Sequence, residues 1–406
     1  MLHCFNPGHE TAVLNGSPHY TPARSRLKMQ TDLAYIPAWY ACGDDYVLVN
    51  EIATPADDFR QLLAPLSPRL AKAVVVEDIA RRKDIFCEMS VVLWGISPQS
   101  CYLFEKINKK HEINLIIPSW HDIYKELNSR QTARICVEKL VADLPEISSE
   151  IVPQFYAAVD EIQQIVERDS STRNNTYIVK TPYSSSGCGL LWLNGVLQRS
   201  ERQLLAGMLK RQHVVSVEKA LNKAVDFSAQ FFSTGIGKVN FQGYTLFRTD
   251  CKGNYEGSML ASQAVVKEAI SSYLDIRLVE SATECLRVFL ETHLPSTHTG
   301  SVGVDMLIYE SGEQYRLHPC VEINLRYNMG FLALRLFENF MENTSTGFFH
   351  AEYCKIPGEV YRKHAVMKQR FPLRIASNGK IASGYFPLCP VTEKSHYHAW
   401  GKINLS

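Results

Sequence analysis

Two short apolar segments carry acidic and amide side chains of the kind that bind hard cations. The first runs from Gly303 to Ile308 and contains Asp305, and the second runs from Val321 to Arg326 and contains Glu322 and Asn324. Side chains two apart on a strand point to the same face, so Glu322 and Asn324 share one face. A lone carboxylate is costly to bury, and a hard cation offsets that cost. The pattern therefore predicts a Mg²⁺ site completed by water and nucleotide phosphates. A half-buried hairpin with polar residues on its wet side is the alternative for these residues alone.

A strand and a loop upstream have the composition of a phosphate site. Residues Tyr177 to Lys180 form an apolar run that ends in a cation, and a loop of small residues follows. Lysine can reach a phosphate as a point charge, and glycine lets backbone N–H groups close over phosphate oxygens. The loop matches neither a P-loop nor a dinucleotide fingerprint. A plain hairpin connection is the alternative. The candidate residues of the loop are Ser184, Ser185, Ser186, Gly187 and Gly189.

Two further runs carry carboxylates suited to a nucleoside. Val214 to Leu221 reads as an apolar strand that ends in charged residues, among them Glu218 and Lys219. Asp226 to Phe231 alternates like a second strand. An exposed backbone edge after the first of these strands could pair with adenine, and Asp226 could accept hydrogen bonds from ribose hydroxyls. Taken separately, these are ordinary surface carboxylates.

In this order along the chain, the motifs resemble the ATP-grasp superfamily, in which two α+β subdomains clamp Mg-ATP. The pattern is most similar to the D-alanine–D-alanine ligase type and spans about residues 126 to 345. In that type a strand lysine and a Ser/Gly loop hold the phosphates, and a Val-Glu-Lys-x-Leu hinge holds adenine. A carboxylate then holds ribose, and an Asp…Glu-x-Asn set holds two Mg²⁺.

The resemblance implies a role for each matched position. Lys180 would touch the α- or β-phosphate, and residues 184–189 would cover the phosphates. Glu218 with Lys219 would frame adenine, and Asp226 would bind ribose. The metal set for Mg²⁺ or Mn²⁺ would be Asp305, Glu322 and Asn324.

Two positions depart from the family pattern. The family often has a second lysine at the start of the clamp, where this sequence has Arg130 as a replacement. Gly303 stands where the ligases often place an arginine that steadies the transferred phosphate. Arg326 and Arg248 are the candidate catalytic residues that would supply that charge, because a guanidinium fork fits phosphate oxygens bidentately. An exposed ion pair is the alternative for either arginine.

Hairpin register separates the predicted metal ligands. If Ser311 and Gly312 form the turn, Asp305 lies opposite His318, and Glu322 lies four residues too far along. Proline cannot donate to a ladder, so a bulge at Pro319 would bring Glu322 back toward Asp305.

Length and pattern predict three parts. At 406 residues the chain is longer than a single hydrophobic core usually allows. We expect an α/β N-terminal domain with a parallel sheet, an α+β ATP-grasp clamp of two subdomains, and a small C-terminal β extension. The turn at residues 5–11 is a candidate for lining the acceptor site, with a plain strand-to-helix turn as the alternative. The expected boundaries are 1–125, 126–345 (subdomains about 126–215 and 216–345) and 346–406.

Composition narrows the class of protein. With a formal charge of +1, nothing in the composition suggests a polyanion as the main partner, and we expect no nucleic acid partner. The apolar runs are too short for a bilayer, and the first residues lack the regions of a signal peptide. Eleven cysteines without a Cys-x-x-Cys motif favour reduced thiols. We therefore expect a cytoplasmic enzyme with no membrane partner, with a homodimer as the default.

Together these features predict an ATP- and Mg²⁺-dependent ligase that joins a carboxylate to an amine through an acyl phosphate. Its partners would be small molecules, whose identity the sequence does not reveal. One alternative is an ATP-grasp kinase that phosphorylates a small molecule. Another is a nucleotide-binding protein without turnover, which the separation of Asp305 from Glu322 suggests.

Overall fold

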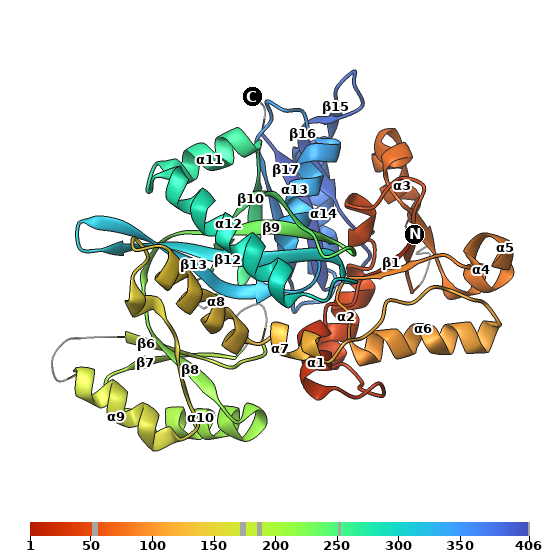
Figure 1. Ribbon diagram of the computed structural model, residues 1–406. Helices are drawn as coiled ribbons and strands as arrows, with labels where there is room; N and C mark the ends of the chain where they lie inside the picture. The colour runs from red at the N-terminus through yellow and green to blue at the C-terminus, as the bar shows by residue number, and fades with distance from the viewer. Residues whose placement is uncertain (51–55, 171–175, 185–188, 251–252, 405–406) are drawn as a thin grey trace. The chain divides into compact units, whose positions relative to one another are not determined.

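The computed structural model describes residues 1–50, 56–170, 176–184, 189–250 and 253–404 (Figure 1). The chain divides into two compact units that do not follow chain order. Unit 1 comprises residues 1–121, 256–266 and 326–406, and unit 2 comprises residues 122–255 and 267–325. The predicted boundaries near residues 126, 216 and 346 remain predictions. Among the described residues, no helix has the length and apolar character needed to cross a membrane.

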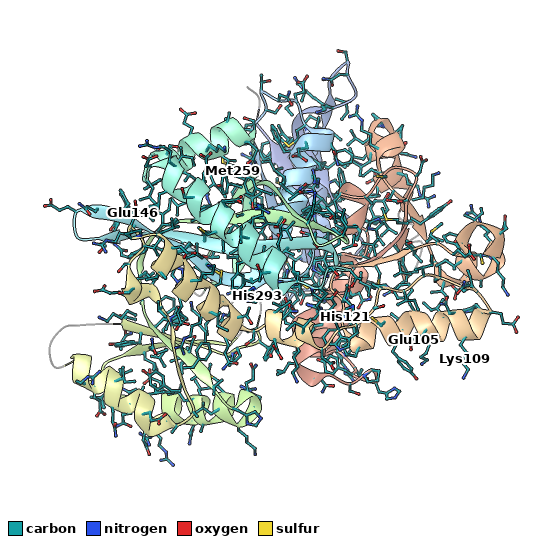
Figure 2. The ribbon with its side chains drawn as sticks, viewed as in Figure 1. Glu105, Lys109, His121, Glu146, Met259 and His293 are labelled. Carbon is teal, nitrogen blue, oxygen red and sulfur yellow. The ribbon has the colours of Figure 1, made fainter. Side chains whose placement is uncertain are left out.

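Unit 1 begins with a parallel sheet, as the spacing of apolar runs predicted. Its strands β1 (Leu2–Cys4), β2 (Tyr46–Leu48), β3 (Lys72–Val74) and β4 (Val91–Leu93) follow the order β3-β2-β1-β4. Helix α6 (Pro98–His111) packs Phe104 and Ile107 into its core and exposes Glu105 and Lys109, which extend outward in Figure 2. The other helices here are α1 (His9–Asn15), α2 (Arg24–Asp32), α3 (Ala56–Leu63), α4 (Val76–Arg81) and α5 (Lys83–Phe86), with 3₁₀ turns η1 (Ile36–Trp39) and η2 (Ala64–Arg69).

The rest of unit 1 is an antiparallel region near the C-terminus. Its strands lie in the order β11 (Tyr255–Leu260), β14 (Gly347–Tyr353), β17 (Tyr397–Ile403), β16 (Ile381–Pro387) and β15 (Arg374–Ile375). Strands β15 and β16 form a hairpin, with Gly379 at φ 74° in the turn between them. A side chain at that φ is strained, which is why glycine suits the position. Helices α13 (Met329–Phe340) and α14 (Glu359–Arg370) complete the region.

Unit 2 contains a short antiparallel sheet covered on one face by two helices. Its strands β5 (Gln154–Tyr156), β8 (Val215–Lys219), β6 (Thr176–Lys180) and β7 (Leu190–Asn194) follow the order β5-β8-β6-β7. Alternate residues of β6 and β8 are apolar, and they pack against α9 (Val159–Ser170) and α10 (Arg199–Gln212). The opposite face of this short sheet is therefore the one that carries polar side chains.

Unit 2 also contains a long sheet, defined here as β13 (Gln314–Asn324), β12 (Thr299–Ser311), β9 (Asn222–Thr234) and β10 (Val239–Thr249) in that order. Helix α8 (Arg130–Asp143) packs against β13, and α12 (Ile276–His293) packs against β10. At the start of α8 the Ser129 hydroxyl accepts a hydrogen bond from the Gln131 N–H. The remaining elements of unit 2 are α7 (Ile123–Leu127) and η3 (Ser149–Ile151), and α11 (Gln263–Ser271) has residues in both units.

Candidate nucleotide and metal site

The long sheet has one apolar and one polar face. Directly opposed residues of neighbouring strands share a face, and residues two apart on a strand share it as well. Asp305 pairs with Glu322 on β13 and with Ser228 on β9, so these three side chains lie on one side. The other side is filled by buried Phe227, Ala229, Phe231, Val304 and Met306. The polar face carries Asp226, Ser228, Gln230, Thr245, Asp305, His318, Glu322 and Asn324.

A bulge in β13 brings the predicted metal ligands together. The hairpin turn is Gly312-Glu313, one residue later than expected, because Ser311 pairs with Gln314. Leu307 then pairs with His318, and the next aligned pair is Asp305 with Glu322. One residue of β12 thus opposes the three residues 319–321 of β13. The expected bulge is confirmed, and its physical basis is the missing N–H of Pro319.

The predicted metal set contains oxygen donors on adjacent positions. The Asn324 amide nitrogen donates to Asp305 Oδ2 at 3.0 Å, so these two side chains are in contact. Within the described ranges, no group of three or more His, Cys, Asp or Glu side chains is placed to hold a metal ion. Two carboxylates and one amide fit Mg²⁺, which commonly takes one or two protein carboxylates and completes its shell with water and phosphate.

Arg130 connects the predicted metal ligand Glu322 to the start of the predicted phosphate loop. Its Nη2 donates to Glu322 Oε2 at 2.6 Å. Its Nη1 donates to the Thr181 carbonyl at 2.8 Å and to Ser184 Oγ at 2.5 Å. The planar guanidinium has donors enough for all three acceptors, which a lysine in this position would not reach in one geometry. Arg130 therefore contacts both the predicted metal ligand Glu322 and the first residues of the predicted phosphate loop, and its replacement of the second family lysine stays a prediction.

Lys180 and Glu218 form a buried ion pair on the polar face of the short sheet. Lys180 Nζ donates to Glu218 Oε2 at 2.6 Å, and their side chains are 11% and 15% exposed. Ser216 Oγ donates to the other carboxylate oxygen at 2.8 Å. Burial raises the pKa of Glu218, but the Lys180 ammonium, His318 and the Ser216 hydroxyl together hold this pKa below its ordinary value. Ser216 was not predicted, although its spacing of two from Glu218 already placed both on one face.

His318 lies on the polar face of the long sheet, in the same row as Asp226. Leu307 pairs with His318 on one side and with Asp226 on the other. His318 is buried, and burial lowers its pKa to about 4, opposed by Glu218 and assisted by Lys180. The charges of the ion pair of the short sheet therefore act on this imidazole, which burial keeps neutral.

The base of the phosphate loop is closed by backbone and by a glycine. The Thr181 N–H donates to the Gly189 carbonyl at 3.1 Å. Gly189 has φ 78°, and a Cβ there would lie 2.4 Å from Thr181 Oγ1, so no other residue fits without strain. Of the predicted loop residues, Ser185, Ser186 and Gly187 lie outside the described residues.

The residues predicted to bind the nucleoside, and Arg248, differ in the face of the sheet on which they lie. Asp226 accepts hydrogen bonds from Lys223 Nζ at 2.5 Å and Thr249 Oγ1 at 3.0 Å. Lys219 is exposed and alternates away from Glu218. Arg248 is also exposed and follows Phe247, the partner of Asp226, so it lies on the opposite face. The structure thus does not bring Arg248 together with the polar face.

Arg326, the other predicted catalytic arginine, belongs to unit 1. Its Nε donates to Glu10, and the side chains are 15% and 12% exposed. Burial raises the pKa of Glu10, but the charge of Arg326 and then that of His9 hold it below the ordinary value. Glu10 lies in the turn predicted as an acceptor-site candidate, which leads from β1 into α1. The Asn6 amide fastens this turn by donating to the Gly95 carbonyl and accepting from the Gly95 N–H.

Comparison with solved structures identifies the fold. Biotin carboxylase from Campylobacter jejuni, in complex with β,γ-ATP, gives a TM-score of 0.50 at 10% identity over 99% of this chain and 87% of that chain. The chain has the ATP-grasp fold. The superfamily resemblance predicted from the motif order is confirmed at the level of the fold.

Two other solved structures are also similar. N5-carboxyaminoimidazole synthetase from Staphylococcus aureus with ADP gives a TM-score of 0.48 at 13% identity over 100% and 93% of the two chains. The biotin carboxylase domain of 2-oxoglutarate carboxylase from Hydrogenobacter thermophilus gives 0.48 at 9% identity over 89% and 86%. No family model and no curated protein sequence matches the chain.

Proposed function

We propose that this ATP-grasp chain is an ATP- and Mg²⁺-dependent ligase that joins a carboxylate to an amine through an acyl phosphate. One observation carries the proposal. Arg130 holds the Glu322 carboxylate of the long sheet and also the first residues of the phosphate loop, Thr181 and Ser184. The groups that we propose to bind metal and phosphate thus share a single cation. The likeness to a fold solved with β,γ-ATP supports ATP as the nucleotide.

The proposed roles follow from charge and position. Lys180 and Arg130 balance the negative charge of the phosphates, and Asp226 accepts hydrogen bonds from ribose hydroxyls. Asp305, Glu322 and Asn324 hold Mg²⁺ or Mn²⁺, which when bound neutralises charge on the phosphate oxygens. The protein then acts mainly by positioning and electrostatic stabilisation.

The reaction balances without a general base from the chain. A carboxylate oxygen attacks the γ-phosphorus, the bond to the β-phosphate oxygen breaks, and ADP leaves. The amine nitrogen then attacks the acyl carbon and inorganic phosphate leaves, while the amine proton passes to phosphate or to water. Closing the site around the acyl phosphate limits its hydrolysis.

The test is release of ADP and phosphate from the full chain. A thermal-shift screen of amino acids, small peptides and organic acids with a non-hydrolysable ATP analogue first selects candidate substrates. We expect ADP and phosphate in equal amounts only when a carboxylate and an amine are both present. ADP without free phosphate, together with a phosphorylated hydroxyl compound, would replace the ligase by a kinase. Nucleotide binding without any ADP would replace it by a protein that binds and does not turn over.

A further inference from the structure

His318 is a buried histidine that neither the metal set nor the phosphate loop accounts for. It is 4% exposed, and within the described part of the chain its Nδ1 has no hydrogen-bond partner. A buried nitrogen without a partner has lost its water and gained nothing in return, which costs free energy. Such an atom in a polar site suggests a partner that arrives only in another state of the protein.

The register fixes the direction of this side chain. His318 is the last residue before the bulge, and it shares the polar face with Glu322 beyond the bulge and with Asp226 two strands away. The charged groups that act on it from the short sheet are Glu218 on β8 and Lys180 on β6. Arg130 faces the same region but is bonded to Glu322.

Nucleotide binding changes the partners of Glu218. In the proposed complex Lys180 turns its ammonium to a phosphate, so the Glu218 carboxylate keeps only the hydroxyl of Ser216 among its present hydrogen bonds. An adenine amine is a neutral donor and leaves the charge unbalanced. A buried carboxylate that loses its cation is strongly destabilising.

We propose that His318 is a positioning residue. It replaces Lys180 as the cationic hydrogen-bond donor to the Glu218 carboxylate when Lys180 binds the phosphates of the nucleotide. This inference rests on the nucleotide site of the proposed function. In the complex the imidazole takes one proton from solvent, becomes a cation beside Glu218, and donates a hydrogen bond to it. No covalent bond other than this N–H bond forms or breaks, and the hydrogen bond from Lys180 to Glu218 is replaced by one from His318. The exchange keeps Glu218 charged and fixed while Lys180 moves.

The direction of the pH effect follows from the charges around His318. In the free protein Lys180 opposes protonation of His318, and in the complex the phosphates neutralise Lys180 while Glu218 attracts the proton. The complex therefore holds more protons than the free protein below about pH 7, and nucleotide affinity rises as the pH falls.

The experiment is calorimetric titration of the full chain with ADP, with a chelator in place of divalent metal, at about pH 6 in two buffers of different ionisation enthalpy. We expect wild type to take up as much as one proton more than His318→Gln, and to bind ADP about tenfold more tightly than that variant at this pH. The titration of ADP itself is common to both proteins and cancels in the difference. At about pH 8 the affinities should converge.

Two further variants test whether His318 is the group that takes up the proton. Glu218→Gln removes the charge that attracts the proton, so we expect it to lose the uptake. His298→Gln is the matched control, because His298 is also buried in unit 2 but contacts the Tyr124 hydroxyl, so its uptake should equal that of wild type.

Each outcome decides one claim. Equal uptake in wild type and His318→Gln would overturn the inference and leave the nucleotide site standing, because another group would then be titrating. Absence of uptake in wild type that binds ADP would overturn it as well, even if His318→Gln fails to fold. Absence of ADP binding by folded wild type would instead remove the proposed function.

Discussion

Two largely buried ion pairs among the described residues of unit 2, Arg130–Glu322 and Lys180–Glu218, differ in how their cations are held. Both have a nitrogen–oxygen distance of 2.6 Å. The Arg130 side chain is also fixed by Thr181 and Ser184, whereas the Lys180 ammonium, among the described residues, shows a single hydrogen bond, to Glu218. The guanidinium of Arg130 is thus held by several acceptors at once, whereas the ammonium of Lys180 is a point charge on a flexible side chain. From this difference we predict that Arg130 stays in place when a ligand binds and that the Lys180 ammonium moves.

The largest expected effect on turnover comes from the Glu322 carboxylate of the Arg130–Glu322 pair. Glu322→Gln removes the charge a metal needs, so we expect Mg²⁺-dependent turnover to fall by about a hundredfold or more. The amide oxygen that this change introduces can still accept from Arg130, so the free energy of unfolding should fall by only about 1 kcal/mol. Calorimetric titration with Mn²⁺ and ADP measures the metal directly. Asp305→Asn should behave similarly, and unchanged Mn²⁺ affinity in both variants would mean that the metal set is elsewhere.

Removing the Lys180 cation tests whether the Glu218 carboxylate is buried. Lys180→Met leaves the Glu218 carboxylate with Ser216 and a neutral imidazole, so we expect a loss of roughly 2–4 kcal/mol in the free energy of unfolding. The double change Lys180→Met, Glu218→Leu removes both charges and should recover most of that loss. Urea denaturation measures both. A single variant as stable as wild type would show that Glu218 is solvated and not held by Lys180.

These expectations rest on residues that the sequence placed well. Lys180, Glu218 and Glu322 were assigned to strands from local apolar runs, and the strands β6, β8 and β13 contain them. Strand periodicity also predicted that Glu322 and Asn324 share a face. Proline chemistry predicted the bulge, because the missing N–H of Pro319 is a property of the residue and not of its surroundings.

Other features depend on contacts between distant parts of the chain. No local pattern reveals that residues 326–406 join residues 1–121 in unit 1, so Arg326 was grouped with residues of unit 2. The ion partners of Arg130 and Lys180 are 192 and 38 residues away in sequence. The partner of a charge is set by tertiary packing, and such long-range contacts cannot be predicted from one sequence without relatives.

A pH effect on stability tests whether His318 is neutral and buried in the free protein. Its folded pKa of about 4 lies below the unfolded value near 6.5, so only the unfolded chain takes up the proton between these values. Stability is therefore present above about pH 6.5 and is lost as the pH falls toward 4. We expect the loss between pH 7 and pH 5 to be about 2 kcal/mol smaller in His318→Gln. Denaturant titrations at both pH values measure it, and parallel curves for the two proteins would contradict the burial of this group.

The smallest expected effect is that of a conservative change at Arg130. Arg130→Lys keeps the charge but loses the fork that reaches Ser184, Thr181 and Glu322 together. We expect about 1 kcal/mol less stability and about tenfold weaker nucleotide binding. Arg134→Lys is the matched control, because Arg134 lies on the same helix in an exposed pair with Glu138. Equal effects of the two changes would mean that Arg130 contributes charge alone.

The central claim is that the polar faces of the two sheets of unit 2 form a Mg-ATP site. Calorimetric titration of the full chain with a non-hydrolysable ATP analogue and Mg²⁺, beside GTP and NAD, tests it most directly. We predict binding of the ATP analogue in preference to GTP and NAD, and a weaker affinity in Lys180→Met that still folds. Absence of binding to folded wild type at millimolar ATP analogue with Mg²⁺, or equal affinity for all three nucleotides, would contradict the claim.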